Sequence, residues 1–121
     1  LALQTNAPLI YPRGEKKAYG TQRAIEGVFC AGETILVIDD LITRGDSKLE
    51  AILPLEQAGL QVDDVLVLVD RQQGGAEDLA ERGYRLHAVL PLDMLLDVLA
   101  EDGAISLAQR DEVLAYIADA R

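Results

Sequence analysis

One stretch constrains the fold of this chain more than any other, the fifteen residues TILVIDDLITRGDSK at positions 34–48. Residues 34–38 form a short apolar run, mostly β-branched, which is typical of a strand buried on both faces of a parallel sheet. We therefore predict that this is the central strand of such a sheet. Two carboxylates, Asp39 and Asp40, follow where the strand should end.

A loop and a helix start come directly after the acidic pair. The loop has the pattern Thr43-x-Gly45-x-Ser47, and Ser47-x-x-Glu50 has the spacing of a capping box at a helix N-terminus. Loop amides and the positive end of a helix dipole bind anions. Carboxylates accept hydrogen bonds from vicinal hydroxyls or hold a hydrated Mg²⁺. The order strand, acidic pair, loop and helix therefore predicts a phosphate–sugar site beyond the carboxyl end of a strand.

The remaining periodicity predicts alternating strands and helices, which indicates an α/β fold with a parallel sheet. The strand at 64–70 is again almost continuously apolar and leads into Asp70 and Arg71 at the same sheet edge as the acidic pair. The last helix opens with Ser106-x-x-Gln109, a second capping-box spacing. We expect the apolar faces of the last two helices to cover the sheet. The other predicted elements are short strands at 8–11 and 24–30, helices at 47–58 and 76–82, a strand at 84–90, and helices at 92–101 and 106–121.

Length and composition limit the class of protein. A chain of 121 residues is expected to be one domain, covering 1–121, and its apolar runs are too short to span a bilayer. The single cysteine, Cys30, excludes an internal disulfide, fits a reducing cytoplasm and is interpreted as a small packing or loop residue. The net charge of −10 argues against nucleic acid or an anionic membrane as a partner.

The basic residues of this acidic chain are concentrated in one loop. Four of the eleven, Arg13, Lys16, Lys17 and Arg23, fall within eleven positions. The surrounding glycines and mixed charges predict a mobile loop or β-ribbon at 12–22. One local basic loop suits a small polyanion better than a long one, although an ordinary solvated basic loop has the same composition.

Four motifs of this sequence, taken together and in their order along the chain, resemble those of a known family. Residues 37–47, VIDDLITRGDS, look like the phosphoribosyl diphosphate (PRPP) signature of the type I phosphoribosyltransferases. The flanking segments, RGEKKAYG at 13–20, IEG at 25–27 and VDRQQGG at 69–75, resemble orotate phosphoribosyltransferase, especially the form found as a domain of UMP synthase. The similarity covers essentially the whole chain.

The resemblance implies a Rossmann-like type I phosphoribosyltransferase core with a flexible loop and with helices on both faces of its parallel sheet. It also implies transfer of the phosphoribosyl group from PRPP to orotate, giving orotidine 5′-phosphate and pyrophosphate in pyrimidine (UMP) synthesis. The cofactor would be Mg²⁺, carried mainly by PRPP near Asp39 and Asp40 rather than by a dedicated protein site. The implied partners are PRPP, orotate, a second copy in a cytoplasmic homodimer and, by fusion or association, an orotidine 5′-phosphate decarboxylase.

Residue roles follow from the same resemblance. The catalytic residues would be Lys17, Asp39 and Asp40, with the carboxylates near the ribose and Lys17 on the diphosphate. Arg71 matches the family arginine that holds the orotate carboxylate, a task that suits its planar fork. The remaining substrate-binding residues would be Arg13, Lys16 and Tyr19 in the basic loop and Thr43, Arg44, Gly45, Asp46 and Ser47 around the 5′-phosphate.

Three departures from the family pattern affect these expectations. Gly14 stands where the family usually has a lysine, and Asp46 stands where it prefers Gly, Ser or Thr. The chain starts at Leu1 without the family's N-terminal hood, which supplies an aromatic residue and a lysine for orotate, and without its first core strand. We therefore expect the domain to be N-terminally incomplete relative to the family, and the chain alone to be a poor or inactive enzyme.

Two other functions fit parts of the sequence. A non-catalytic PRPP- or nucleotide-binding regulatory module would keep the phosphate loop without the hood. A type I transferase for a purine or uracil would keep the PRPP signature but should lack the flanking segments at 13–20 and 70–72. A structure with residues 34–38 in a helix or at a sheet edge would contradict the predicted arrangement.

Overall fold

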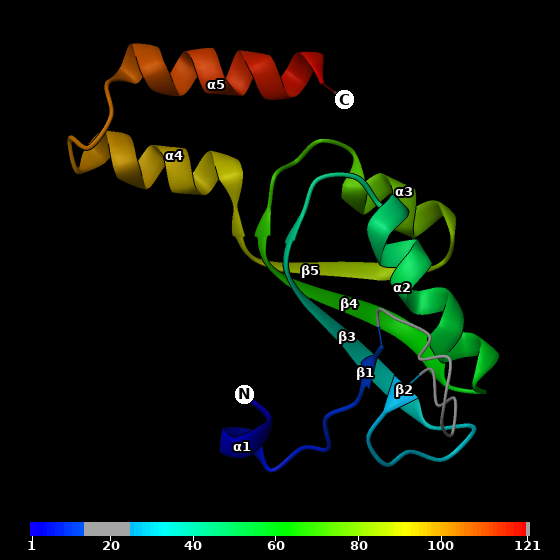
Figure 1. Cartoon of the computed structure of the whole chain (residues 1–121). Coiled ribbons are helices and arrows are strands. Elements are labelled where there is room, and N and C mark those ends of the chain that lie inside the picture. Colours follow the sequence, from blue (N-terminus) through cyan, green and yellow to red (C-terminus); the bar gives the residue numbers. More distant parts are fainter. Residues whose placement is uncertain (14–24, 121) are drawn as a thin grey trace.

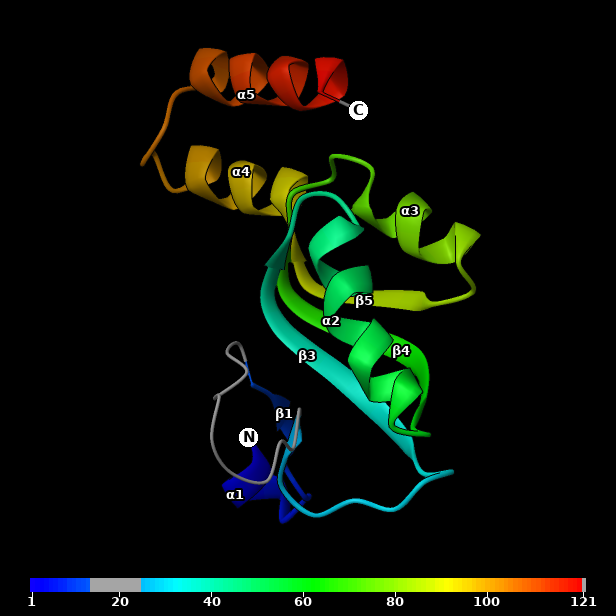
Figure 2. The same cartoon turned by 45° about the vertical axis from the view of Figure 1, so that its right-hand side comes forward.

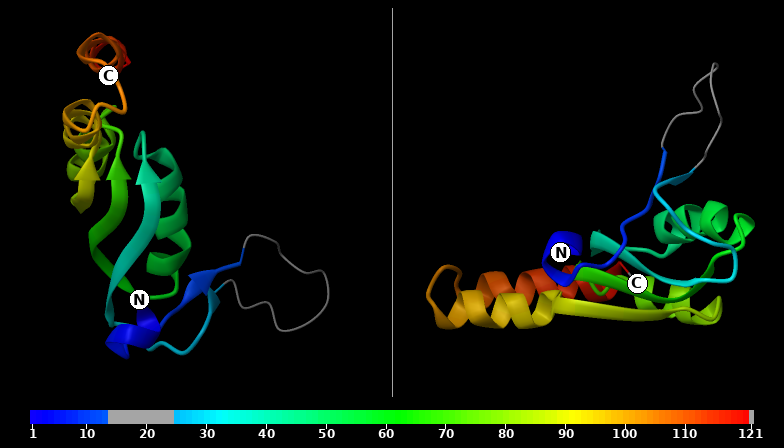
Figure 3. Two further views of the ribbon diagram at one scale, coloured as in Figure 1. Left: turned by 90° about the vertical axis from the view of Figure 1, so that its left-hand side faces the viewer. Right: turned by 90° about the horizontal axis from the view of Figure 1, so that it is seen from below.

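The fold is a three-stranded parallel sheet with helices between its strands (Figure 1). The computed structural model describes residues 1–13 and 25–120. In the sheet, β3 (Thr34–Ile42), β4 (Gln61–Asp70) and β5 (Arg85–Pro91) lie in the order β3-β4-β5, and both pairings are parallel. All three strands end at one edge (Figure 3, left). The predicted α/β class with a parallel sheet is confirmed.

The position predicted for the strand at 34–38 is wrong within this sheet. That segment belongs to β3, which is an edge strand, whereas β4 is central because β5 returns alongside it. Only every second residue of β3 faces the core, so Leu36 and Ile38 are 49% and 51% exposed. Among the described residues, the apolar segment 34–38 is therefore covered on one face of the sheet and not, as predicted, on both.

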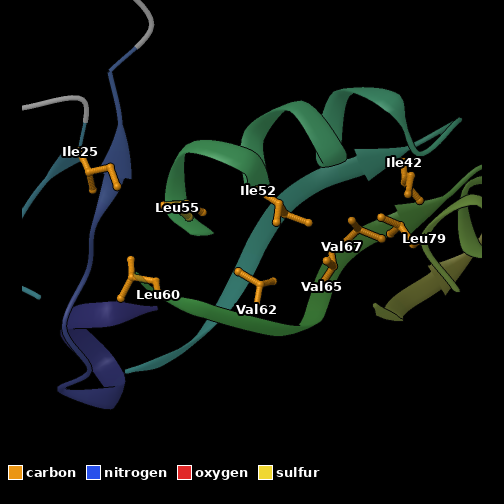
Figure 4. Packing of buried hydrophobic residues seen from close by; sticks show 9 residues of the cluster. All are labelled: Ile25, Ile42, Ile52, Leu55, Leu60, Val62, Val65, Val67 and Leu79. Atoms are coloured by element: carbon orange, nitrogen blue, oxygen red, sulfur yellow. The ribbon is translucent and has the colours of Figure 1, made fainter. Parts of the chain in front are cut away.

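Helices α2 (Asp46–Gln57) and α3 (Gly75–Glu81) pack on one face of the sheet (Figure 2). Ile52 of α2 and Leu79 of α3 meet Val65 and Val67 of β4 there, and their side chains lie between helix and sheet (Figure 4). All four are almost fully buried. The expected helices on both faces are not found among the described residues, where Leu36, Ile38 and Leu68 leave the second face open.

The N-terminal part adds a small ribbon beside α2. The helix α1 (Ala2–Thr5) precedes β1 (Tyr11–Pro12), which pairs antiparallel with β2 (Ile25–Glu26). Both strands are shorter than the sequence predicts. Ile25 joins the core near Leu55 and Leu60, so the ribbon lies by the C-terminal half of α2 (Figure 4).

The last two helices do not cover the sheet, contrary to the prediction. The helices α4 (Leu92–Glu101) and α5 (Leu107–Asp119) pack on each other beyond the strand ends (Figures 1 and 3). Arg110 Nε lies 2.6 Å from an Asp97 carboxylate oxygen and joins the two helices. The predicted capping box at the start of α5 is confirmed by Ser106 and Gln109. Among the described residues, no helix combines the length and apolar character needed to cross a membrane.

Candidate active site

The two acidic residues lie inside β3, shortly before its end at Ile42, and not after the strand as predicted, because the strand continues beyond the apolar run. Their surroundings differ. Asp39 Oδ1 accepts the backbone N–H of Asp40 at 2.8 Å, and its Oδ2 lies 2.5 Å from Nζ of Lys48 on α2. The Lys48 hydrogen bond, helped by the Asp40 N–H, holds the pKa of the Asp39 carboxyl below its ordinary value although partial burial opposes this. Consecutive residues of a strand point to opposite faces. Asp39 therefore faces α2, and Asp40 faces the open side.

The predicted phosphate loop runs from the end of β3 into α2. Thr43 is half-buried and Arg44 exposed, while Asp46 and Ser47 are exposed in the first turn of the helix. The backbone N–H groups of a first helical turn lack carbonyl partners within the helix and can bind an anion. The exposed position of Asp46 places its carboxylate at the start of the helix, where it also complements the helix dipole.

The predicted capping box at Ser47 and Glu50 is wrong. The helix N-cap is Gly45, and no side chain caps the helix. The chain already turns at Gly45, whose carbonyl accepts the backbone N–H groups of Lys48 and Leu49 at 3.0 Å each. Ser47 thus lies inside the first turn rather than before it.

Asp78 of α3 is a residue of this edge that sequence reasoning missed. Its Oδ2 accepts the backbone N–H of Gly45 at 3.0 Å, so this predicted phosphate-binding amide is already paired with a carboxylate. A Cβ atom at Gly45 would lie 2.6 Å from the Cβ of Asp78, so α2 and α3 approach too closely there for a larger residue. Nothing in the local sequence around residue 78 indicates this long-range contact.

Arg44 reaches away from the loop toward the chain's last helix. One of its terminal nitrogens donates to the carbonyl of Ala120 at 2.9 Å, at the C-terminal end of α5. A cation is favoured at that end of a helix because the last carbonyls carry partial negative charge. The side chain of Arg44 is therefore paired with α5 in this structure.

Arg71 lies beside the phosphate loop, as predicted from the strand ends. It follows β4 directly, and its backbone N–H donates to the Ile42 carbonyl at 3.0 Å, which joins the ends of β3 and β4. Its side chain is exposed at this edge. Two residues further, Gln73 is buried, and its Oε1 has no hydrogen-bond partner among the described residues.

The structure does not bring Arg13 to this edge. The Arg13 guanidinium forms an ion pair with Glu26 of β2, in the ribbon beside the C-terminal half of α2. The phosphate loop is at the other end of this 12-residue helix, about 18 Å away along its axis. The predicted roles of Lys16, Lys17 and Tyr19 fall outside the described residues.

Metal binding by protein side chains alone has little support at this edge. In the described ranges, no three His, Cys, Asp or Glu residues are grouped so that they could hold a metal ion. Mg²⁺ commonly takes one or two carboxylates and completes its octahedron with phosphate oxygens and water. Asp40 fits that use better than Asp39, since hydrogen bonds within the described residues engage both oxygens of Asp39 but only Oδ1 of Asp40.

Comparison with known proteins fits this geometry. The chain is 45% identical over 106 residues to a bifunctional enzyme PyrF/PyrE of a Nostoc species, which covers 88% of this chain and 22% of that protein. It is 42% identical over 95 residues to orotate phosphoribosyltransferase of Natronomonas pharaonis, covering 78% of this chain and 55% of the other. By sequence, this chain is a relative of the orotate phosphoribosyltransferases. No protein-family profile matches it.

The fold agrees with that relationship. The UMP synthase structure from Leishmania donovani superposes on 98% of this chain with a TM-score of 0.87 and 39% sequence identity, while using 25% of its own chain. The fold is thus that of the type I phosphoribosyltransferases. This chain spans about half the length of the Natronomonas orotate phosphoribosyltransferase and less than a quarter of the Nostoc protein.

Proposed function

We propose that this chain supplies the PRPP-binding part of an orotate phosphoribosyltransferase. The reaction would transfer the phosphoribosyl group from PRPP to orotate and give orotidine 5′-phosphate and pyrophosphate. One observation carries the proposal: Asp39, Asp40, the loop before α2 and Arg71 meet at one edge of the sheet. The names of its relatives support orotate, rather than a purine or uracil, as the acceptor.

Each group at this edge suits one part of such a reaction. The carboxylates accept hydrogen bonds from ribose hydroxyls and stabilise positive charge that develops on the sugar ring in the transition state. The amides of Asp46 and Ser47, together with the hydroxyls of Thr43 and Ser47, suit the 5′-phosphate. The exposed guanidinium of Arg71 suits the orotate carboxylate. When bound with PRPP, Mg²⁺ would neutralise part of the diphosphate charge.

Wider features of the resemblance belong to the same proposal. We place Lys17, Lys16, Tyr19 and Arg13 on the diphosphate side of the ligand, which requires Arg13 to exchange its pairing with Glu26 for a phosphate. The bifunctional name of the Nostoc relative supports association with a decarboxylase domain. The proposal also includes assembly of the protein as a homodimer and its location in the cytoplasm.

Calorimetry with PRPP and Mg²⁺ tests the binding site. The chain should bind PRPP, and Asp39→Asn combined with Asp40→Asn should weaken binding at least tenfold, because two acceptors for ribose hydroxyls lose their charge. The matched control changes Glu101→Gln and Asp102→Asn, an exposed acidic pair at the end of α4. Equal losses of PRPP affinity in the two double variants would show that the effect is not specific to Asp39 and Asp40, and would contradict the site.

An orotate-consumption assay separates transfer from binding alone. The assay compares this chain with a version extended upstream of Leu1 to the length of its orotate phosphoribosyltransferase relatives. With PRPP and Mg²⁺ present, the extended version should consume orotate much faster than the chain alone, and Arg71→Ala in it should raise the KM for orotate far more than the Kd for PRPP. A non-catalytic module is the second candidate, favoured by the pairing of the Gly45 amide with Asp78 and by the distant Arg13. That module would bind PRPP at the same edge without consuming orotate.

A further inference from the structure

Lys48 is a buried cation in a place that does not favour one. The residue is 6% exposed, and it lies in the first turn of α2. The N-terminal end of a helix carries partial positive charge, which repels a cation. Burial of a charge is costly unless the charge is paired. A lysine here therefore needs a compensating anion.

Asp39 is that anion, and the pairing holds the carboxylate in place. Lys48 Nζ is 2.5 Å from Asp39 Oδ2, while Oδ1 accepts the Asp40 N–H. Both oxygens are thus bound from different directions, one by a side chain of α2 and one by the strand itself. The Asp39 side chain is still 44% exposed, so it remains accessible to a ligand at this edge.

Asp40 is in a different situation. Its Oδ1 accepts the backbone N–H of Leu41 at 2.7 Å. Within residues 1–13 and 25–120, no ion pair joins Asp40 to a cationic side chain. The adjacent carboxylates therefore differ in charge compensation, since Asp39 is paired with Lys48 whereas no cationic side chain of the described residues pairs with Asp40.

We propose that Lys48 is a positioning residue for the sugar site, a role that rests on the proposed function. It fixes the Asp39 carboxylate for hydrogen bonding to a ribose hydroxyl and offsets part of its charge toward the phosphates of the ligand. A ligand with a 5′-phosphate and a diphosphate is repelled by each uncompensated carboxylate nearby. Lys48 reduces the repulsion from Asp39, while both carboxylates remain able to accept hydrogen bonds.

The first test compares PRPP affinity in two variants that each remove one cation. Lys48→Met keeps a flexible, unbranched side chain for the buried space but leaves Asp39 unpaired. It should weaken PRPP binding about tenfold, as expected for loss of a hydrogen bond to a charged group. Arg110→Met is the matched control, because it removes a cation from the Asp97 ion pair between α4 and α5 and should leave affinity unchanged.

The second test asks whether Lys48 acts through Asp39. In an Asp39→Asn background there is no charge to cancel, so adding Lys48→Met should cause no further loss of PRPP affinity. A role in packing alone would give the same loss in both backgrounds, and that result would overturn the inference. If the single Lys48→Met variant does not fold, the Asp39→Asn variant and the Asp39→Asn, Lys48→Met double variant still give a test. Equal PRPP affinity in these two variants supports the inference, and a further loss on adding Lys48→Met overturns it.

The two proposals fail in different ways. Absence of PRPP binding by the unsubstituted chain would overturn the proposed function together with the role of Lys48. PRPP binding that is equally tight in the unsubstituted chain and in Lys48→Met would leave the proposed function standing and overturn only the role of Lys48.

Discussion

Asp64 shows how one carboxylate joins two strands on the open face of the sheet. Its Oδ1 lies 2.9 Å from Arg85 Nε and 2.8 Å from His87 Nε2, and its Oδ2 accepts from Arg85 at 3.0 Å. Asp64 stands opposite Arg85 in the register of β4 and β5, so this is a cross-strand pair. The Arg85 hydrogen bonds, followed by that of His87, hold the pKa of Asp64 below its ordinary value of 3.8.

The lowered pKa gives a prediction for acid unfolding. A carboxyl group whose pKa is lower in the folded state stabilises the fold above its unfolded pKa, and this contribution is lost as the pH falls through the folded value. Asp64→Asn should therefore show a smaller loss of stability in urea between pH 6 and pH 3 than the unsubstituted chain. Asp63→Asn is the control, because Asp63 accepts hydrogen bonds from the neutral Gln61 side chain. An unchanged acid dependence in Asp64→Asn would contradict the prediction.

At the scale of elements, the junction of α2 and α3 shapes the candidate active site. Gly45 is the N-cap of α2 and is buried against Asp78 of α3, which accepts its N–H. The backbone angles of Gly45 are ordinary for any residue, with φ at −75°. The requirement for glycine is therefore steric, because a Cβ atom would collide with Asp78.

Substitution of Gly45 by alanine should destabilise the fold. The expected loss is about 1–3 kcal/mol in urea unfolding, as for other overpacked sites. In an Asp78→Gly background the colliding atom is absent, so the same substitution should cost much less. An equal cost in both backgrounds would show that the close approach of the helices is not the cause.

At the scale of the whole molecule, the core lies on one side of the sheet. Ile52 of α2 is 1% exposed and faces β4, whereas its neighbour Leu53 is 55% exposed. The second face of the sheet carries Leu36, Ile38 and Leu68, each about half exposed. Stability should therefore depend on one layer of side chains between the sheet and its two helices.

A pair of neighbouring alanine substitutions tests this one-sided core. Ile52→Ala should reduce the free energy of unfolding by about 2–5 kcal/mol, since it leaves a cavity among buried side chains. Leu53→Ala should change it by about 0.5 kcal/mol or less, since surface substitutions usually have small effects. Similar losses in urea unfolding would mean that both faces of α2 are buried.

Short-range patterns in the sequence are enough to predict part of this fold. The apolar runs at 34–38 and 64–70 correctly predict two strands, although β3 and β4 are longer, at Thr34–Ile42 and Gln61–Asp70. The spacing at Ser106 correctly predicts the capping box of α5. Arg71 was also placed correctly beside the loop, because parallel strands end at the same edge. These features depend on burial and backbone conformation within a few residues.

Which helices and strands contact one another depends on the packing of the whole domain. An apolar run does not reveal whether its strand is central or at an edge. The predicted central position of residues 34–38 is therefore wrong, and β4 is the middle strand of the sheet. The sequence likewise does not reveal that Lys48 pairs with Asp39 or that Asp78 accepts the Gly45 N–H. The residues of these two pairs are 9 and 33 positions apart. Such contacts form because packing α2 and α3 onto one face brings their polar side chains to the strand ends. Local propensity contains no information about that packing, since its energy comes from surfaces distant in the sequence.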